Sequence, residues 1–151
     1  MNLWIEKSIS TALGIGYLPL APGTWASVLT VAAWYLMAEY FDPGFVLQLL
    51  IIAVIVMAGF YSVSKVQPEW GKDPSRVVID EVAGMSIACF MIPAGILNYC
   101  IALALFRFFD IVKPLGIRKA EKLGGATGVM LDDIVAGIAA NLLTLAILCF
   151  I

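Results

Sequence analysis

The chain has 151 residues, of which 62% are hydrophobic and 13% are charged, about half the charged share of an ordinary globular domain. Its net charge of −2 argues against a nucleic-acid-binding protein, which normally carries a basic excess. The sequence contains no histidine, which excludes histidine-based triads, histidine-ligated zinc sites and phosphatases with a histidine nucleophile.

The charges are confined to a few segments, and residues 8–38, 43–64, 82–106 and 134–151 carry none. Such long apolar stretches predict an all-α, polytopic helical membrane protein with short spans, in a single domain over residues 1–151. The first residues lack the cleavage pattern of a signal peptide.

Residues 8–20 are apolar but interrupted by glycine and proline, which predicts a short helix or a re-entrant, broken segment. The turn Pro22-Gly23-Thr24 follows, and Thr24 is placed to cap the next helix. Backbone that is not helical at membrane depth must be satisfied by protein or by water, so we expect this segment to line a cavity.

Two spans are predicted over residues 25–41 and 45–63, joined by the turn Asp42-Pro43-Gly44. Each is near the lower length limit for crossing a bilayer. A polar loop is expected over residues 64–79.

The uncharged stretch 82–106 is interrupted by Pro93-Ala94-Gly95. We expect a helical hairpin with arms over 78–92 and 96–112, rather than one kinked span. The hairpin matters because it returns the chain to one side of the membrane. The last helix is expected over 129–151, with Asp132 and Asp133 in its first turn.

The turn at residues 39–44 has no basic residue, so the other loops hold all nine lysines and arginines. The positive-inside rule therefore places the N-terminus and the segments 64–81 and 107–133 in the cytoplasm.

Two acidic pairs stand out, Asp80-Glu81 and Asp132-Asp133. Each pair alone is explained by the preference for acids at a helix N-terminus. Both, however, lead into helices with small residues that allow close approach, which would bring four carboxylates together. Clustered carboxylates need a cation or protons, and oxygen ligands of this kind suit Mg²⁺.

Basic residues accompany these acids. Arg107, Asp110 and Lys113 share roughly one helix face, which fits either an ion pair at the membrane boundary or a phosphate clamp. The glycines of Gly124-Gly125-Ala126-Thr127-Gly128 are placed to aim backbone N–H groups at an anion. The remaining basic residues of this segment predict a surface patch that faces anionic headgroups; they are Arg118, Lys119 and Lys122.

Four segments together resemble the phosphatidylglycerophosphatase A family, in the same order and over nearly the whole chain. They are Pro22-Gly23-Thr24, the run Val78 to Met85, the run Phe106 to Pro114, and the run Gly124 to Gly137.

The resemblance implies an all-helical enzyme of the bacterial inner membrane that uses Mg²⁺ to hydrolyse phosphatidylglycerophosphate to phosphatidylglycerol and phosphate, with the active site facing the cytoplasm. It implies Mg²⁺ ligands at Asp80, Glu81, Asp132 and Asp133, and catalytic roles for Asp80, Asp110 and Asp133. It implies substrate contacts at Thr24, Arg107, Lys113 and Gly125. Neither the residues nor the resemblance predicts an oligomeric state.

A different class of protein fits part of the pattern: a small cation channel or transporter that uses the acidic clusters as an ion site. No internal repeat supports it. A CDP-alcohol phosphotransferase would gather its aspartates in one long motif, whereas here they lie in separate segments. A non-catalytic subunit leaves the many potential ligands unexplained.

Overall fold

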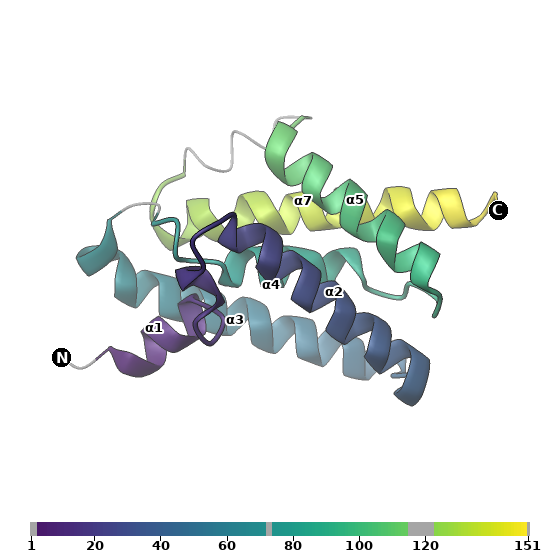
Figure 1. Cartoon of the computed structure of the whole chain (residues 1–151), viewed down its shortest axis with the longest axis horizontal. Coiled ribbons are helices and arrows are strands. Elements are labelled where there is room, and N and C mark those ends of the chain that lie inside the picture. The colour runs from purple at the N-terminus through teal and green to yellow at the C-terminus, as the bar shows by residue number, and fades with distance from the viewer. Residues whose placement is uncertain (1–2, 72–73, 115–122, 151) are drawn as a thin grey trace.

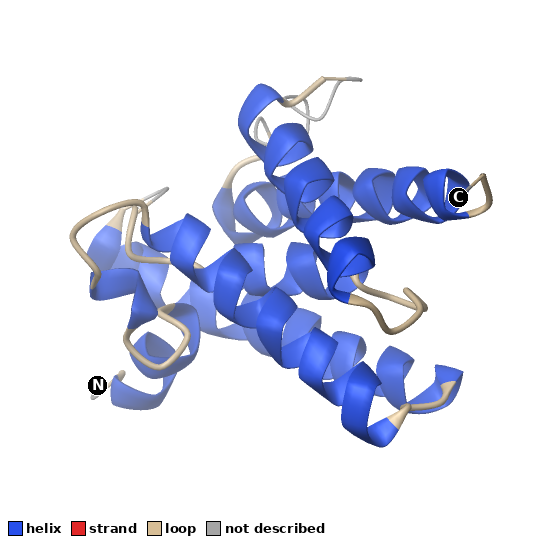
Figure 2. Cartoon of the chain, turned by 45° about the vertical axis from the view of Figure 1, so that its right-hand side comes forward, coloured by secondary structure: helices blue, strands red, loops and turns tan. Residues whose placement is uncertain are grey.

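The structure is a computed structural model that describes residues 3–71, 74–114 and 123–150 (Figure 1). Across these residues the chain forms six α-helices and one 3-10 turn, with no strand (Figure 2). The predicted all-α class is confirmed. The basic patch at Arg118, Lys119 and Lys122 lies outside the described residues.

The N-terminal segment is broken, as predicted, but its helix lies earlier than expected. Helix α1 covers Trp4–Ser10, and a 3-10 turn, η1, covers Ile15–Tyr17. Between them Ala12 and Leu13 adopt positive φ angles of 47° and 59°. The helix begins early because Glu6 and Lys7, the charged residues just before the apolar stretch, are good helix formers.

The next two helices run in opposite directions on either side of a tight turn (Figure 1). Helix α2 covers Pro22–Phe41, with its proline in the first turn, where the missing N–H costs nothing. Helix α3 covers Phe45–Trp70 and ends at Gly71, whose φ of 95° suits glycine. The polar loop expected from residue 64 therefore begins seven residues later, because Lys65 and Glu69 continue a helix at its polar end rather than stop it.

Two helices in the described part of the chain are long and apolar enough to cross a membrane, α3 and α7, the latter covering Gly125–Leu148. In α3 the most apolar stretch has a mean hydropathy of 2.4, yet only 17% of it is buried inside the protein. An apolar helix surface left this bare fits contact with lipid. The segment 25–41, which was predicted to span the membrane, is helical, but it is less apolar than α3 and α7 and is not among the helices that meet this criterion.

The predicted hairpin is present. Helix α4 covers Ile79–Ala88 and α5 covers Ile96–Val112, and residues 89–95 form the turn between them. In Figure 1, α5 runs back from the far end of α4 toward its beginning. Gly95, with a φ of 145°, supplies the reversal, and the Tyr99 hydroxyl closes it by donating to the Ile92 carbonyl at 3.2 Å.

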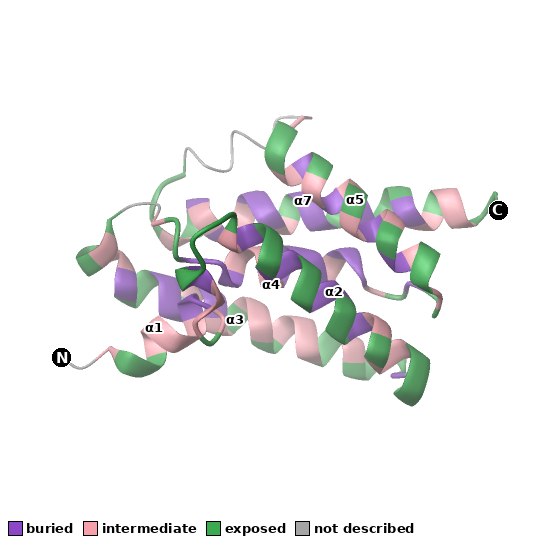
Figure 3. Cartoon of the chain, viewed as in Figure 1, coloured by how far each residue is buried: buried purple, intermediate pink, exposed green. Residues whose placement is uncertain are grey.

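Helix α4 is the centre of the molecule. It contacts α2, α3, α5 and α7, and Figure 3 shows it largely buried among them. One core cluster, around Trp34, Met85 and Phe106, packs α2, α4, α5 and α7 together. A second, around Val63, Ile79 and Met130, joins α3 to α4 and α7. The short α4 is thereby fixed on several sides, which makes it a rigid platform for the residues at its start.

Candidate active site

The first acidic pair lies where the sequence predicts it. Asp80 and Glu81 occupy the first turn of α4, which begins at Ile79 without a side-chain cap. The helix dipole favours acids in this position. That preference explains why the helix tolerates them, but not why their oxygens lie close to an acid of another helix.

The second acidic pair was expected in the first turn of its helix. In the structure it lies two turns along the helix. Helix α7 begins at Gly125, so Asp132 and Asp133 lie well inside a buried stretch. The prediction that this helix starts at residue 129 was wrong, because it treated the preceding glycines as helix breakers. In the structure Gly124 and Gly125, with φ angles of 70° and 61°, lead into the first turn of the helix. The helix dipole acts only within the first turn, so it does not explain these two acids.

Glycines bring α4 and α7 into backbone contact. A Cβ added at Gly84 would lie 2.5 Å from the Asp133 carbonyl oxygen, and one at Gly137 would lie 3.0 Å from the Gly84 carbonyl carbon. Such an approach is open only to residues without side chains. It places the backbone of Asp133 beside the middle of α4, one turn beyond Asp80.

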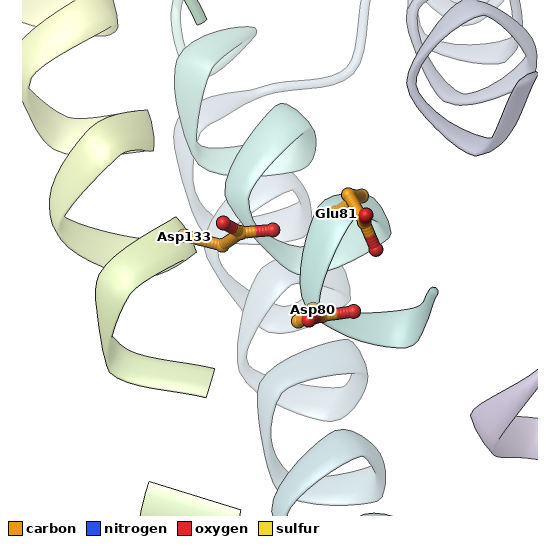
Figure 4. Close-up of side chains that lie close together, drawn as sticks. All are labelled: Asp80, Glu81 and Asp133. Atoms are coloured by element: carbon orange, nitrogen blue, oxygen red, sulfur yellow. The ribbon is translucent and has the colours of Figure 1, made fainter. Parts of the chain in front are cut away.

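Three carboxylates meet as a result (Figure 4). Asp80, Glu81 and Asp133 each offer an oxygen atom, and these oxygens lie within 4.8 Å of one another. In the described residues, Asp80 Oδ1 and Glu81 Oε2 are buried and have no hydrogen-bond partner. Unpartnered carboxylate oxygens in this arrangement fit a bound cation, because burial without a partner is costly.

Burial also shifts the ionisation of the α4 pair. It raises the pKa of the Asp80 carboxyl well above the ordinary value, and the charges of Glu81 and Asp133 raise it further. Burial likewise raises the pKa of Glu81, although the Arg107 guanidinium acts in the opposite direction. Without a cation, the cluster therefore holds protons more tightly than isolated carboxyls do.

Two ion pairs flank the three carboxylates. Lys113 Nζ donates to Asp132 Oδ2 at 2.7 Å, and Arg107 pairs with Asp110 one turn along α5. Asp132 therefore lines the same cavity as the other acids but lies outside the group of three. Of the four residues expected to hold metal, the structure brings three together, and the fourth, Asp132, forms an ion pair with Lys113.

The start of α2 joins the site from the other side. The Thr24 hydroxyl accepts a hydrogen bond from Arg107 at 3.3 Å. A Cβ on Gly23 would collide with the Glu81 carboxylate, so glycine here leaves room for that acid. Thr24 was predicted at the site, whereas Gly23 was not; the turn Pro22-Gly23-Thr24 was its only signal in the sequence.

A cavity of about 280 Å³ joins the three carboxylates to Asp132, whereas Thr24 and Arg107 are not part of its wall. Its wall includes Asp110 and Lys113, and the glycines at the start of α7 complete it; these are Gly124, Gly125 and Gly128. The predicted glycine segment therefore lies at the site, but from Gly125 onward it is helix rather than a loop. A compartment with carboxylates at one end and cations beside them can hold a metal ion together with a phosphate group.

Comparison with known proteins identifies the family of the chain. The profile of the family Phosphatidylglycerophosphatase A matches residues 8–148. A Bacteroides thetaiotaomicron protein, provisionally named phosphatidylinositol-3-phosphatase, is 42% identical over 142 residues, covering 89% of this chain and 88% of its own length. No solved structure matches significantly.

Two further relatives carry the family's own name. Phosphatidylglycerophosphatase A of Haemophilus influenzae is 34% identical, covering 92% of this chain and 86% of its own length. The protein of the same name from Escherichia coli is 32% identical, covering 86% of this chain and 76% of its own length. The chain belongs to the phosphatidylglycerophosphatase A family and is a membrane-associated lipid phosphatase.

Proposed function

We propose that this protein hydrolyses the terminal phosphomonoester of phosphatidylglycerophosphate and that it requires Mg²⁺ to do so. One observation carries the proposal: three carboxylates from two helices converge, with two unpartnered buried oxygens, in a cavity that Lys113 also lines.

The donor set fits the metal. Asp80, Glu81 and Asp133 offer only oxygen atoms, which are the ligands that Mg²⁺ prefers. When bound, Mg²⁺ polarises phosphoryl oxygens and lowers the pKa of water.

The flanking residues suit the phosphate. Lys113 offers a point charge and Arg107 a planar fork, and each is held by an acid that can release it to an incoming phosphate. Thr24 keeps the Arg107 guanidinium turned toward α2. Gly125, on the cavity wall, leaves the space beside the phosphate open.

Two routes to hydrolysis are consistent with these positions. In one, a carboxylate oxygen of Asp80, Asp110 or Asp133 accepts the proton of the attacking water. In the other, a carboxylate oxygen of Asp110 or Asp80 attacks phosphorus and expels the phosphatidylglycerol oxygen, which takes up a proton, and water then hydrolyses the resulting aspartyl phosphate. Rapid quenching with labelled substrate distinguishes them, because only the second leaves phosphate covalently bound to the protein.

The charge distribution supports a location in the bacterial inner membrane, as a multi-pass protein with the site facing the cytoplasm. The site lies at the end of the molecule where α4 begins and α5 ends, next to the basic segment 107–113. The positive-inside rule assigns that end to the cytoplasm.

A second candidate substrate is phosphatidylinositol 3-phosphate, which the name of the Bacteroides relative favours. It carries a phosphomonoester on a ring rather than on a glycerol. The chemistry of the three carboxylates serves either lipid, so the choice depends on how the cavity accommodates the headgroup.

The test is phosphate release by the purified protein from both lipids and from phosphatidic acid, with Mg²⁺ and with a chelator. We expect release from phosphatidylglycerophosphate that depends on Mg²⁺ and falls at least 1,000-fold in Asp80→Asn. Asp42→Asn, the same change in an exposed turn, is the control and should be fully active. Equal activity with the chelator, or in Asp80→Asn, would remove the metal cluster from the mechanism.

A further inference from the structure

A larger cavity lies on the other face of α4. It has a volume of about 510 Å³ and opens between α1, α2 and α3. Its wall is almost entirely apolar; it includes Leu29, Ala33 and Met37 of α2 and Ile51 and Ile55 of α3. A groove of this size and character suits a hydrocarbon ligand.

Two polar side chains in its wall, Trp34 and Ser86, are already hydrogen-bonded. The Trp34 indole N–H donates to Ser86 Oγ at 3.0 Å, and Ser86 Oγ donates to the Val82 carbonyl at 2.7 Å. These groups offer little to a polar ligand, because their hydrogen bonds would have to break first.

The groove is continuous with the lipid-facing surface. Ile51 and Ile55 line it, while their neighbours Leu50 and Val54 are 57% and 59% exposed on the same apolar helix α3. An acyl chain in the bilayer can therefore enter the groove sideways, without crossing water.

The rim of the groove is strained. Ala12 and Leu13, which line it, both have positive φ, and Leu13 is 90% exposed. Two successive residues other than glycine rarely have positive φ angles, and backbone strain of this kind is concentrated at ligand-binding segments. The fold holds this segment over the groove at a cost in free energy.

Helix α4 forms the wall between the groove and the carboxylates. Ile79, Val82 and Ser86 face the groove, whereas Asp80 and Glu81 face the metal cluster. The separation is about one helix diameter, roughly 10 Å. A phospholipid is long enough to place its phosphate on one side of the first turn of α4 and an acyl chain on the other.

We propose that this groove binds one fatty acyl chain of the phospholipid substrate. The assignment of the chain to the substrate rests on the proposed function. Since the chain passes from one hydrocarbon environment to another, the groove contributes packing and position rather than a hydrophobic gain. It would hold the headgroup in register with the carboxylates and favour long chains over short ones.

Two variants on α2 test the proposal. Ala33→Phe places a ring in the groove, while Leu36→Phe adds a similar ring on an exposed position of the same helix, outside the groove wall. Occupancy is measured without turnover, by fluorescence quenching of Trp34 with phosphatidylglycerol brominated on its acyl chains. Trp34 is 5% exposed and lines the groove, so a bromine atom reaches it there. The other three tryptophans are replaced by phenylalanine.

We expect Ala33→Phe to abolish the quenching and to raise KM about fivefold for a dioleoyl substrate, with no change for a dibutyryl substrate. Leu36→Phe should change neither. Absence of quenching in the parent chain would overturn the proposal, and a dimer that cross-links in Leu29→Cys but not in the parent chain would then identify a second copy as the occupant. Loss of quenching with an unchanged KM would assign the groove to a lipid other than the substrate and equally overturn the proposal. If quenching behaves as expected but neither substrate releases phosphate, the proposed function fails while binding of a chain stands.

Discussion

Replacing Gly84 with alanine tests how the site is assembled. The new Cβ would lie 2.5 Å from the Asp133 carbonyl oxygen and 2.6 Å from the Phe106 ring. Ordinary contact begins near 3.4 Å, so α4 and α7 must separate by about 1 Å. Neither neighbour can yield easily, because one is backbone and the other is a fully buried ring.

A displacement of this size separates the acids of α4 from Asp133. Misplacing catalytic groups by about 1 Å costs about 100-fold in rate. Overpacking of the interior costs about 2 kcal/mol of stability, which lowers Tm by several degrees without unfolding the protein. We therefore expect kcat to fall about 100-fold in a protein that remains helical in detergent.

The assay is phosphate release together with a thermal melt followed by circular dichroism. Gly59→Ala is the matched control, because its Cβ would lie 2.5 Å from the flexible end of Met130 and at an ordinary 3.5 Å from Ile79. The control should melt slightly lower and keep most of its activity. If Gly84→Ala were as active and as stable as the parent, the contact between α4 and α7 would not determine the geometry of the site.

Three further predictions concern individual groups at the site. Gly23→Ala should raise the Mg²⁺ concentration for half-maximal activity about tenfold, because its Cβ displaces the Glu81 carboxylate; an unchanged metal titration would contradict this. Asp133→Asn should raise the Mg²⁺ concentration for half-maximal activity. Asp132→Asn should chiefly raise KM, because Asp132 orients Lys113 through an ion pair of 2.7 Å. An equal rise of the Mg²⁺ concentration in both variants would mean that Asp132 is also a metal ligand. The raised pKa values of Asp80 and Glu81 mean that, without metal, the folded protein binds more protons than the unfolded chain. Its Tm in a chelator should therefore fall as pH rises from the ordinary carboxyl pKa toward the raised one, and added Mg²⁺ should restore it most at the higher pH; a Tm that rose over this range would reverse the sign of the argument.

The helices were predictable where hydrophobic periodicity and breakers agree. Residues 25–41 and 45–63 lie within α2 and α3, and Pro93-Ala94-Gly95 lies between α4 and α5, as expected. The errors lie at polar or glycine-rich helix ends. Lys65 and Glu69 were assigned to a loop because they are charged, and Gly125 to Gly128 because they are glycine-rich, although all of them are helical.

Part of the candidate site was predictable as well. The acids and cations were identifiable because an apolar chain has little reason to retain charge. Their pairing was not identifiable, because it depends on which side chain reaches which across helices. Lys113 and Asp132 are 19 residues apart, and Gly23 and Glu81 lie on helices whose contact no local pattern reveals.

The charge balance of the site gives the reason for its composition. Arg107 and Lys113 form ion pairs with Asp110 and Asp132, which leaves Asp80, Glu81 and Asp133 without an ion-pair partner among the described groups. Burying three such carboxylates would cost more than the fold can supply, so they must share protons or bind a cation. An incoming phosphate adds further negative charge and competes for the same lysine and arginine. Protons alone cannot offset that addition, because protonated carboxyls attract a phosphate far less than a divalent ion does. Under the proposed function we therefore expect the cation to bind first and the phosphate to follow.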